Sequence, residues 1–184
     1  MCLALLAIAL VVLVATGAWL WFNYRPTAEA AWPTVRHLVR ARSSWVRSVH
    51  RVASSLAVVL ALACFVLLIG RRLRAGQRGV VAGLALAVTA LATSFTGYLL
   101  PWDQLALWAV TVGTNIKGAQ AIFDARIKYI LIGSREVSVS TYRFWAIAHV
   151  VLGLLVAAAV VLAWLRTRES RPAPEAEPEL VRSS

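Results

Sequence analysis

The sequence predicts an all-α membrane protein whose core is a four-transmembrane-helix bundle. Of its 184 residues, 60% are hydrophobic and only 15% are charged, and the mean hydropathy is +0.74. A soluble domain of this size cannot bury that much apolar surface. Four apolar stretches each reach the roughly 20 residues that a helix needs to cross the hydrocarbon layer. These stretches are too long for β-barrel strands, so helices are predicted.

The uncharged stretches give the predicted spans in chain order, namely residues 2–22, 52–70, 79–100 and 144–165. The first lacks the basic start of a signal peptide, so we expect a retained helix. Residues 45–51 lead into the second span. Residues 1–166 therefore form one transmembrane domain. Residues 167–184 are rich in Pro, Glu, Arg and Ser, which predicts a solvated, disordered tail.

The net charge of +11 comes from 19 basic residues against 8 acidic ones. Such an excess often indicates nucleic-acid binding. Here the arginines lie at span ends and in loops, which indicates contact with membrane lipid, and no nucleic-acid partner is predicted. The loop between the second and third spans carries four arginines, yet the two loops on the opposite side carry more. Charge counting therefore does not establish the orientation that the positive-inside rule would give.

The two cysteines lie in different spans, at Cys2 and Cys64. A disulfide between them stays open at this stage. Buried free thiols, which behave as small apolar side chains, are the expectation.

Two of the three histidines accompany membrane spans, and an ionisable residue there indicates a functional site. His50 lies at the start of the second helix, and His149 lies five residues after Phe144 in the fourth. These helices run in the same direction, so both imidazoles lie within about two turns of the same membrane face. Two facing imidazoles suit a haem iron better than zinc, which prefers four ligands. His37 lies in a polar connection and is predicted to be a surface residue.

Small residues near the histidines would leave room for a flat cofactor. The third span has Gly83, Ala87, Ala90, Ser94 and Gly97 along one face, and the second has Ser54, Ala57 and Ala61 on the face of His50. Close helix packing explains such stripes equally well. The paired histidines favour the cofactor. Arg47, Arg51 and Arg143 stand beside the histidines, where guanidinium groups suit haem propionates.

Several motifs occur in one order along the chain: ATG at 15–17, NYRPT at 23–27, RSVHR at 47–51, GYLLPWDQ at 97–104, WAV at 108–110 and RFWAIAH at 143–149. This set resembles the N-terminal, haem-binding half of the cytochrome b/b6 family of quinol-oxidising complexes. The PWDQ form resembles the short cytochrome b/b6 of photosynthetic complexes most. The resemblance covers about residues 2–165.

The resemblance implies that both termini are cytoplasmic and that the loop between the third and fourth spans lies on the outer face. Short interfacial helices in that loop would form part of a quinone site, with Pro101, Trp102, Leu105 and Trp108 as its candidate residues. Leu105, Trp108 and Val112 would supply the buried face of the first such helix. His50 and His149 match the two ligands of the outer haem, and Arg47 and Arg51 its propionate partners. Arg143 stands one residue further from its histidine than in the family.

The chain also departs from the family. The family has a second histidine pair, one haem level further along the second and fourth spans. At that level this chain has Cys64, Ala163 and Trp164. A Cys64 thiolate is a conceivable iron ligand, but no partner ligand stands opposite. Cys2 lies near a cysteine that holds an extra haem in the photosynthetic branch, but its register differs by one residue. We therefore expect one b haem.

These features predict an electron-transfer subunit rather than a complete enzyme. Its single haem would pass electrons between membrane quinone and an outward-facing redox partner, such as an iron–sulfur, molybdenum or cytochrome subunit. Two alternatives stay open. In one, a separate chain completes a one-haem cytochrome bc-type reductase. In the other, the chain is a haem-free anchor or assembly scaffold. The Arg-over-Lys bias and the richness in Ala and Val favour a bacterial inner membrane.

Overall fold

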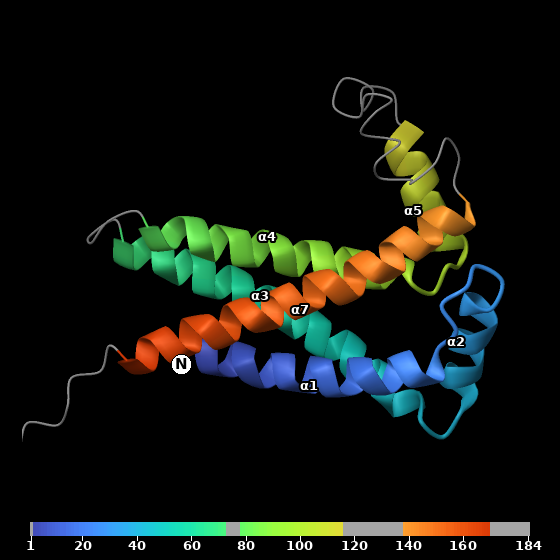
Figure 1. Ribbon diagram of the computed structural model, residues 1–184, viewed down its shortest axis with the longest axis horizontal. Coiled ribbons are helices and arrows are strands. Elements are labelled where there is room, and N and C mark those ends of the chain that lie inside the picture. The colour runs from blue at the N-terminus through green and yellow to red at the C-terminus, as the bar shows by residue number, and fades with distance from the viewer. Residues whose placement is uncertain (1, 73–77, 116–137, 170–184) are drawn as a thin grey trace, which may run out of the picture.

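The computed structural model describes residues 2–72, 78–115 and 138–169. Its helices are α1 (Cys2–Asn23), α2 (Ala31–Arg40), α3 (Ser44–Arg72), α4 (Arg78–Leu99), α5 (Gln104–Asn115) and α7 (Val139–Glu169), and the described residues contain no strand. The four long helices lie side by side, with α2 and α5 at one end (Figure 1). This confirms the all-α, four-transmembrane-helix prediction.

Four helices are long and apolar enough to cross a membrane: Cys2–Asn23, Ser44–Gly70, Val80–Leu99 and Val139–Leu165. Two of them begin earlier than the uncharged stretches, at Ser44 rather than 52 and at Val139 rather than 144. The helical lead-in of α3 contains Arg47, His50 and Arg51. α7 continues to Glu169, and residues 170–184 of the predicted tail lie outside the described residues.

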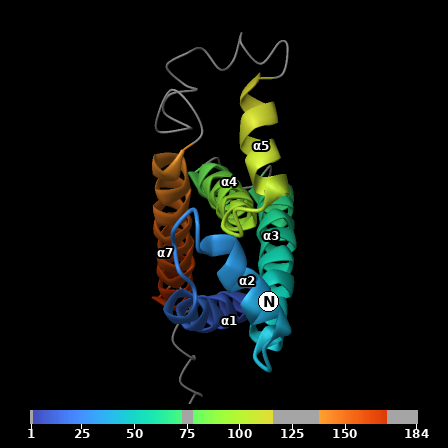
Figure 2. The same ribbon diagram turned by 90° about the vertical axis from the view of Figure 1, so that its right-hand side faces the viewer.

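The long helices form a ring in the order α1, α3, α4, α7, as the view along the bundle shows (Figure 2). Apolar residues from all four helices meet in the interior: Leu6, Ala9, Leu10, Ala57, Ala61, Ala90, Val156 and Val160. Many large apolar side chains are exposed on the outer surface of the bundle, as a lipid-facing surface requires. On α3 and α7 this buried cluster begins about two helical turns beyond the histidines.

A disulfide joins the start of α1 to α3. Cys2 and Cys64 are bonded, with their Cα atoms 5.9 Å apart. Our expectation of free thiols was wrong. Two cysteines that are 62 residues apart meet because α1 and α3 run antiparallel and pack closely along their length.

The end of the bundle that carries the histidines is closed by two tyrosines and the turn after α4. The Tyr24 hydroxyl donates to the Leu100 carbonyl and hydrogen-bonds to the buried Tyr142 hydroxyl. Burial raises the pKa of Tyr24, and the bond to Tyr142 acts in the same direction, so Tyr24 stays protonated as a donor. Trp102 packs edge-on against Tyr142 and adopts a left-handed backbone conformation (φ 48°) in the turn between α4 and α5. Asp103 then accepts a hydrogen bond from the Ala106 N–H at 2.9 Å and caps α5.

Candidate functional site

The structure brings His50 and His149 together, as the sequence predicted. Their ring centroids are 6.5 Å apart, with the ring planes inclined by 66°. A metal–imidazole bond is about 2 Å long, and a ring nitrogen lies roughly 1 Å from the ring centre, so two imidazoles on one iron have centroids about 6 Å apart. The observed separation fits one metal atom between the two rings.

Hydrogen bonds fix the tautomer of His149. Its Nδ1 lies 3.0 Å from the Thr93 carbonyl oxygen. A carbonyl can only accept, so Nδ1 carries the proton and donates it. The Thr96 hydroxyl, 3.1 Å from the same nitrogen, donates its own proton to the Thr93 carbonyl. Nε2 of His149 therefore keeps a free lone pair, which is the form that binds a metal.

His50 is held in the same way by α1. The Thr16 hydroxyl lies 2.9 Å from His50 Nδ1 and 2.6 Å from the Val12 carbonyl oxygen. The hydroxyl donates its one proton to the Val12 carbonyl in this short bond, so Thr16 accepts from His50 Nδ1–H. The lone pair on Nε2 of His50 is free as well. Both histidines are thus in the ligating tautomer.

A glycine lies directly against each imidazole ring. A Cβ atom added at Gly97 would lie 2.8 Å from Cε1 of His149, and one at Gly17 would lie 3.2 Å from Cε1 of His50. Side chains at these positions would push the rings out of place. Both glycines follow a hydrogen-bonded threonine, in Thr16–Gly17 and Thr96–Gly97. The small-residue stripe already predicted Gly97 near the cofactor, and the repeated Thr-Gly pair is the sequence signal for Thr16, Gly17 and Thr96.

The donor set suits a haem iron. Two neutral imidazoles face each other, and among the described residues no group of three or more His, Cys, Asp or Glu could form a metal site of another kind. Ser54 of α3 and Ser94 of α4 lie near this level, with their hydroxyl oxygens 3.4 Å apart. Small side chains thus line the bundle between the helices that carry the histidines.

The predicted arginines lie at the same end of the bundle. Arg47 is half-buried, one turn before His50, whereas Arg51 and Arg143 are exposed. Arg47 is therefore the best-placed propionate partner of the three. His37 is exposed on α2, in agreement with the prediction that it is a surface residue.

The predicted buried face of α5 is wrong. Leu105, Trp108 and Val112 are exposed to 64%, 61% and 43%, whereas Ala106 and Val110 are buried. Leu105 and Trp108 instead line a hollow of about 400 Å³ on the outer side of α5, together with Gln104. Pro101 and Trp102 are half-buried in the turn before it.

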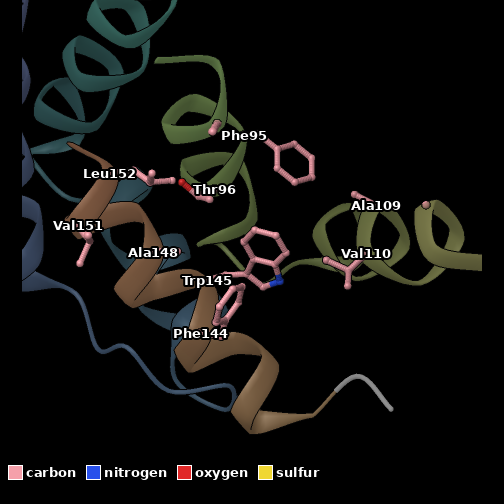
Figure 3. A pocket seen from close by; sticks show the side chains of 11 residues that line it. Phe95, Thr96, Ala109, Val110, Phe144, Trp145, Ala148, Val151 and Leu152 are labelled. Carbon is pink, nitrogen blue, oxygen red and sulfur yellow. The ribbon is translucent and has the colours of Figure 1, made fainter. Parts of the chain in front are cut away.

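A larger cavity lies between α4, α5 and α7, and we call it the α5 groove (Figure 3). Its volume is about 670 Å³, and its lining is Ala92, Phe95, Thr96, Ala109, Val110, Gly113, Phe144, Trp145, Ala148, Val151 and Leu152. None of the residues predicted for the quinone site lines it.

Trp145 lies at the centre of the groove, with ring contacts to Phe95 and Phe144. Its indole nitrogen is directed toward α5, is buried and has no hydrogen-bond partner among the described residues. Thr96 contacts both the groove and His149, so the groove lies directly behind one of the paired histidines.

The fold and the site define a four-helix membrane bundle with a paired-histidine centre near one end. The chain belongs to the family whose model is described as Cytochrome b/b6/petB, which matches residues 2–170. This family implies a b-type haem and a role in membrane electron transport.

A solved structure described as "Hyperthermophilic respiratory Complex III" has a similar fold, with a TM-score of 0.76 and 21% sequence identity. The match covers 96% of this chain and 51% of that one, so the chain spans about half the length of that protein. The likeness supports the fold of the bundle.

Proposed function

We propose that the chain is an electron-transfer subunit that carries one b-type haem between His50 and His149. The haem would exchange electrons with membrane quinone and with an outward-facing redox subunit of iron–sulfur, molybdenum or cytochrome type. The observation that carries this proposal is the pair of facing imidazoles, each with its Nε2 lone pair free. Bound haem supplies one-electron redox chemistry at this level.

The residues of the chain hold and orient this group. The Thr93 carbonyl fixes the tautomer of His149 and the Thr16 hydroxyl that of His50, which is how outer partners keep a ligand oriented and basic. Gly17 and Gly97 keep the rings free of steric pressure. Arg47 would pair with a propionate at the edge of the bundle, in a partly buried position where such a bond is stronger than in water.

One haem is proposed because no second ligand pair is available. The chain has three histidines, and the third lies exposed on α2. The Cys64 sulfur is bonded to Cys2, so it has no free thiolate for a metal. A cluster of buried apolar side chains from all four helices lies beyond the histidines.

Quinone is proposed to bind in the α5 groove. The lining is apolar and aromatic, which suits a quinone ring and its isoprenoid chain. The groove adjoins His149 through Thr96 and Ala148. A quinone there would lie close to the haem, with little polar competition from water.

Haem ligation is tested by reduced-minus-oxidised spectra of purified variants. His149→Ala and His50→Ala are expected to lose the b-type signal, because one ligand cannot hold the iron in its six-coordinate form. His37→Ala is the matched control and should keep the full signal. An undiminished spectrum in His149→Ala would refute the ligand assignment.

The quinone site is tested with a side chain that fills the groove. A Cβ at Gly113 meets no atom within 4 Å, so Gly113→Phe can enter the cavity without disturbing the backbone. We expect it to retain haem but to lose most of the quinol-dependent haem reduction. Val112→Phe, on the exposed face of α5, is the control. Equal reduction rates in both variants would place the quinone elsewhere.

A second candidate function is a one-haem reductase completed by a separate chain. It is favoured by the half-length match to the Complex III protein. Purification of the native complex distinguishes the two candidates, because a partner with further membrane spans would support the reductase.

We propose a bacterial inner membrane, with both termini cytoplasmic. Cysteine labelling from either side of intact cells, with a single cysteine placed in the 167–184 tail of a Cys2/Cys64-free variant, tests that orientation.

A further inference from the structure

α1 and α3 are attached to each other at two points, and the distance between these points is nearly the same along both helices. At one level, Thr16 and Gly17 contact His50. At the other, Cys2 is bonded to Cys64. At 1.5 Å per residue, the two levels are about 22 Å apart along α1 and about 21 Å apart along α3. Two attachments at matched spacing restrict both the sliding and the rotation of α1 against α3.

The fully buried side chains of α1 all lie in the half that contains the disulfide, and beyond them only the partly buried Leu13 packs against the same core. Its buried residues are Leu6, Ala9 and Leu10. From residue 11 to Asn23, every side chain is exposed or half-exposed. Apolar side chains that face lipid contribute little to helix association, because lipid tails solvate them as well as another helix does. The position of Thr16 and Gly17 therefore depends on how firmly the disulfide end of α1 is held.

We propose that the Cys2–Cys64 disulfide is a positioning element for His50. It holds α1 in the register at which Thr16 accepts the Nδ1 proton and Gly17 lies against the ring. This inference rests on the proposed haem site, and it makes that site sensitive to the thiol redox state. Cys64 is 5% exposed and Cys2 is half-exposed, so Cys2 is the sulfur that a reductant would reach.

The chemistry of opening is a thiol–disulfide exchange with a dithiol. One thiolate of the dithiol attacks the Cys2 sulfur, and Cys64 leaves as a thiolate and takes up a proton. The second thiol of the dithiol then closes its own disulfide and releases Cys2 as a thiol. Two electrons and two protons pass to the protein, and the dithiol is oxidised.

The experiment compares oxidised and dithiol-reduced wild-type protein, because the two have identical side chains. Alkylation and mass measurement should find no free thiol before reduction and two after it. After removal of the reductant under anaerobic conditions, transfer of ferric haem to an excess of apomyoglobin should be about tenfold faster from the reduced form, which is the low end of the range for lost outer-shell support. The haem midpoint potential should shift as well.

Substitutions provide the matched controls. Cys2→Ala, Cys64→Ala and the double variant should all behave like the reduced wild type and should not respond to the dithiol. Free thiols in the oxidised protein would overturn the inference. So would identical haem transfer and potential in the oxidised, reduced and double-variant proteins.

A purified protein without haem would refute the proposed function. The positioning role of the disulfide would then be tested by a second measurement, hydrogen exchange. Hydrogen exchange of α1 amides between residue 11 and Asn23 should become faster on reduction. Unchanged exchange there would overturn the inference independently of the haem.

Discussion

Each histidine is held in two similar ways: a threonine hydroxyl lies within hydrogen-bond distance of Nδ1, and the glycine after that threonine lies against the ring. For His149, the Thr93 carbonyl also accepts from Nδ1. Thr16 and Gly17 serve His50, and Thr96 and Gly97 serve His149. The hydrogen bonds at Nδ1 determine the tautomer of each imidazole, and the glycines determine how closely the rings approach the neighbouring helices. The ligands are therefore oriented by the chain itself.

The two glycines differ in how much space they leave, which gives a graded prediction. In Gly97→Ala the new Cβ would lie 2.8 Å from a ring pinned by two hydrogen bonds, so the ring must move. Overpacking of this kind costs about 1–3 kcal/mol, so haem retention should weaken at least about fivefold. Gly17→Ala, at 3.2 Å, should have a smaller effect.

Gly70→Ala is the matched control for this pair. A Cβ there meets nothing within 4 Å, so haem content should equal that of the wild type. The haem-to-protein absorbance ratio of the purified variants measures all three. An equal loss in Gly70→Ala would attribute the effect to folding rather than to the rings.

At this scale, the sequence predicted the histidines but not their surroundings. His50 and His149 could be paired because helix direction and depth follow from span order. Trp145 and Phe144 could not be assigned to a groove, because an aromatic residue in a span looks the same whether it faces lipid, a helix or a cavity. To predict the disulfide, one needs the register of α1 against α3. The limits of the predicted spans do not give that register.

At the scale of elements, α5 is defined by the turn that precedes it. α4 ends at Leu99, Trp102 turns the chain in a left-handed conformation, and Asp103 caps the new helix through the Ala106 N–H. The PWD segment is therefore a helix stop followed directly by a helix start. This turn sets the direction in which α5 leaves the bundle and so shapes the α5 groove.

Removal of the cap should loosen α5. Loss of an Asp N-cap costs about 1 kcal/mol, so Asp103→Ala should speed amide exchange in the first turn of α5 by about fivefold. Asp103→Asn keeps an oxygen acceptor and should exchange nearly as the wild type does. The same rate in Asp103→Ala and the wild type would show that α5 is held by packing alone.

The wrong prediction of the buried face of α5 shows what helical periodicity cannot establish in a membrane protein. Leu105, Trp108 and Val112 recur at helical spacing, which in a soluble protein would indicate the buried face. Lipid and interfacial regions also accept apolar side chains, so spacing identifies an apolar face but not what covers it. The smaller Ala106 and Val110 face the bundle instead, because they allow closer approach of the backbones.

At the scale of the whole molecule, the bundle has two different halves. The half with the histidines is lined by small residues and bounded by the tyrosine pair and by α2 and α5. The other half is filled by apolar side chains and closed by the disulfide. The number of spans could be predicted because each is an uncharged run of sufficient length. The division into halves could not, because it depends on which side chains meet across four helices.

This division underlies the central claim, that the chain holds one haem and holds it between His50 and His149. The most direct measurement is the haem-to-chain ratio, obtained by pyridine haemochrome and amino-acid analysis on the purified full chain. The account predicts one b haem per chain. A ratio of zero would contradict the proposed function, and a ratio of two would contradict the closed second half of the bundle.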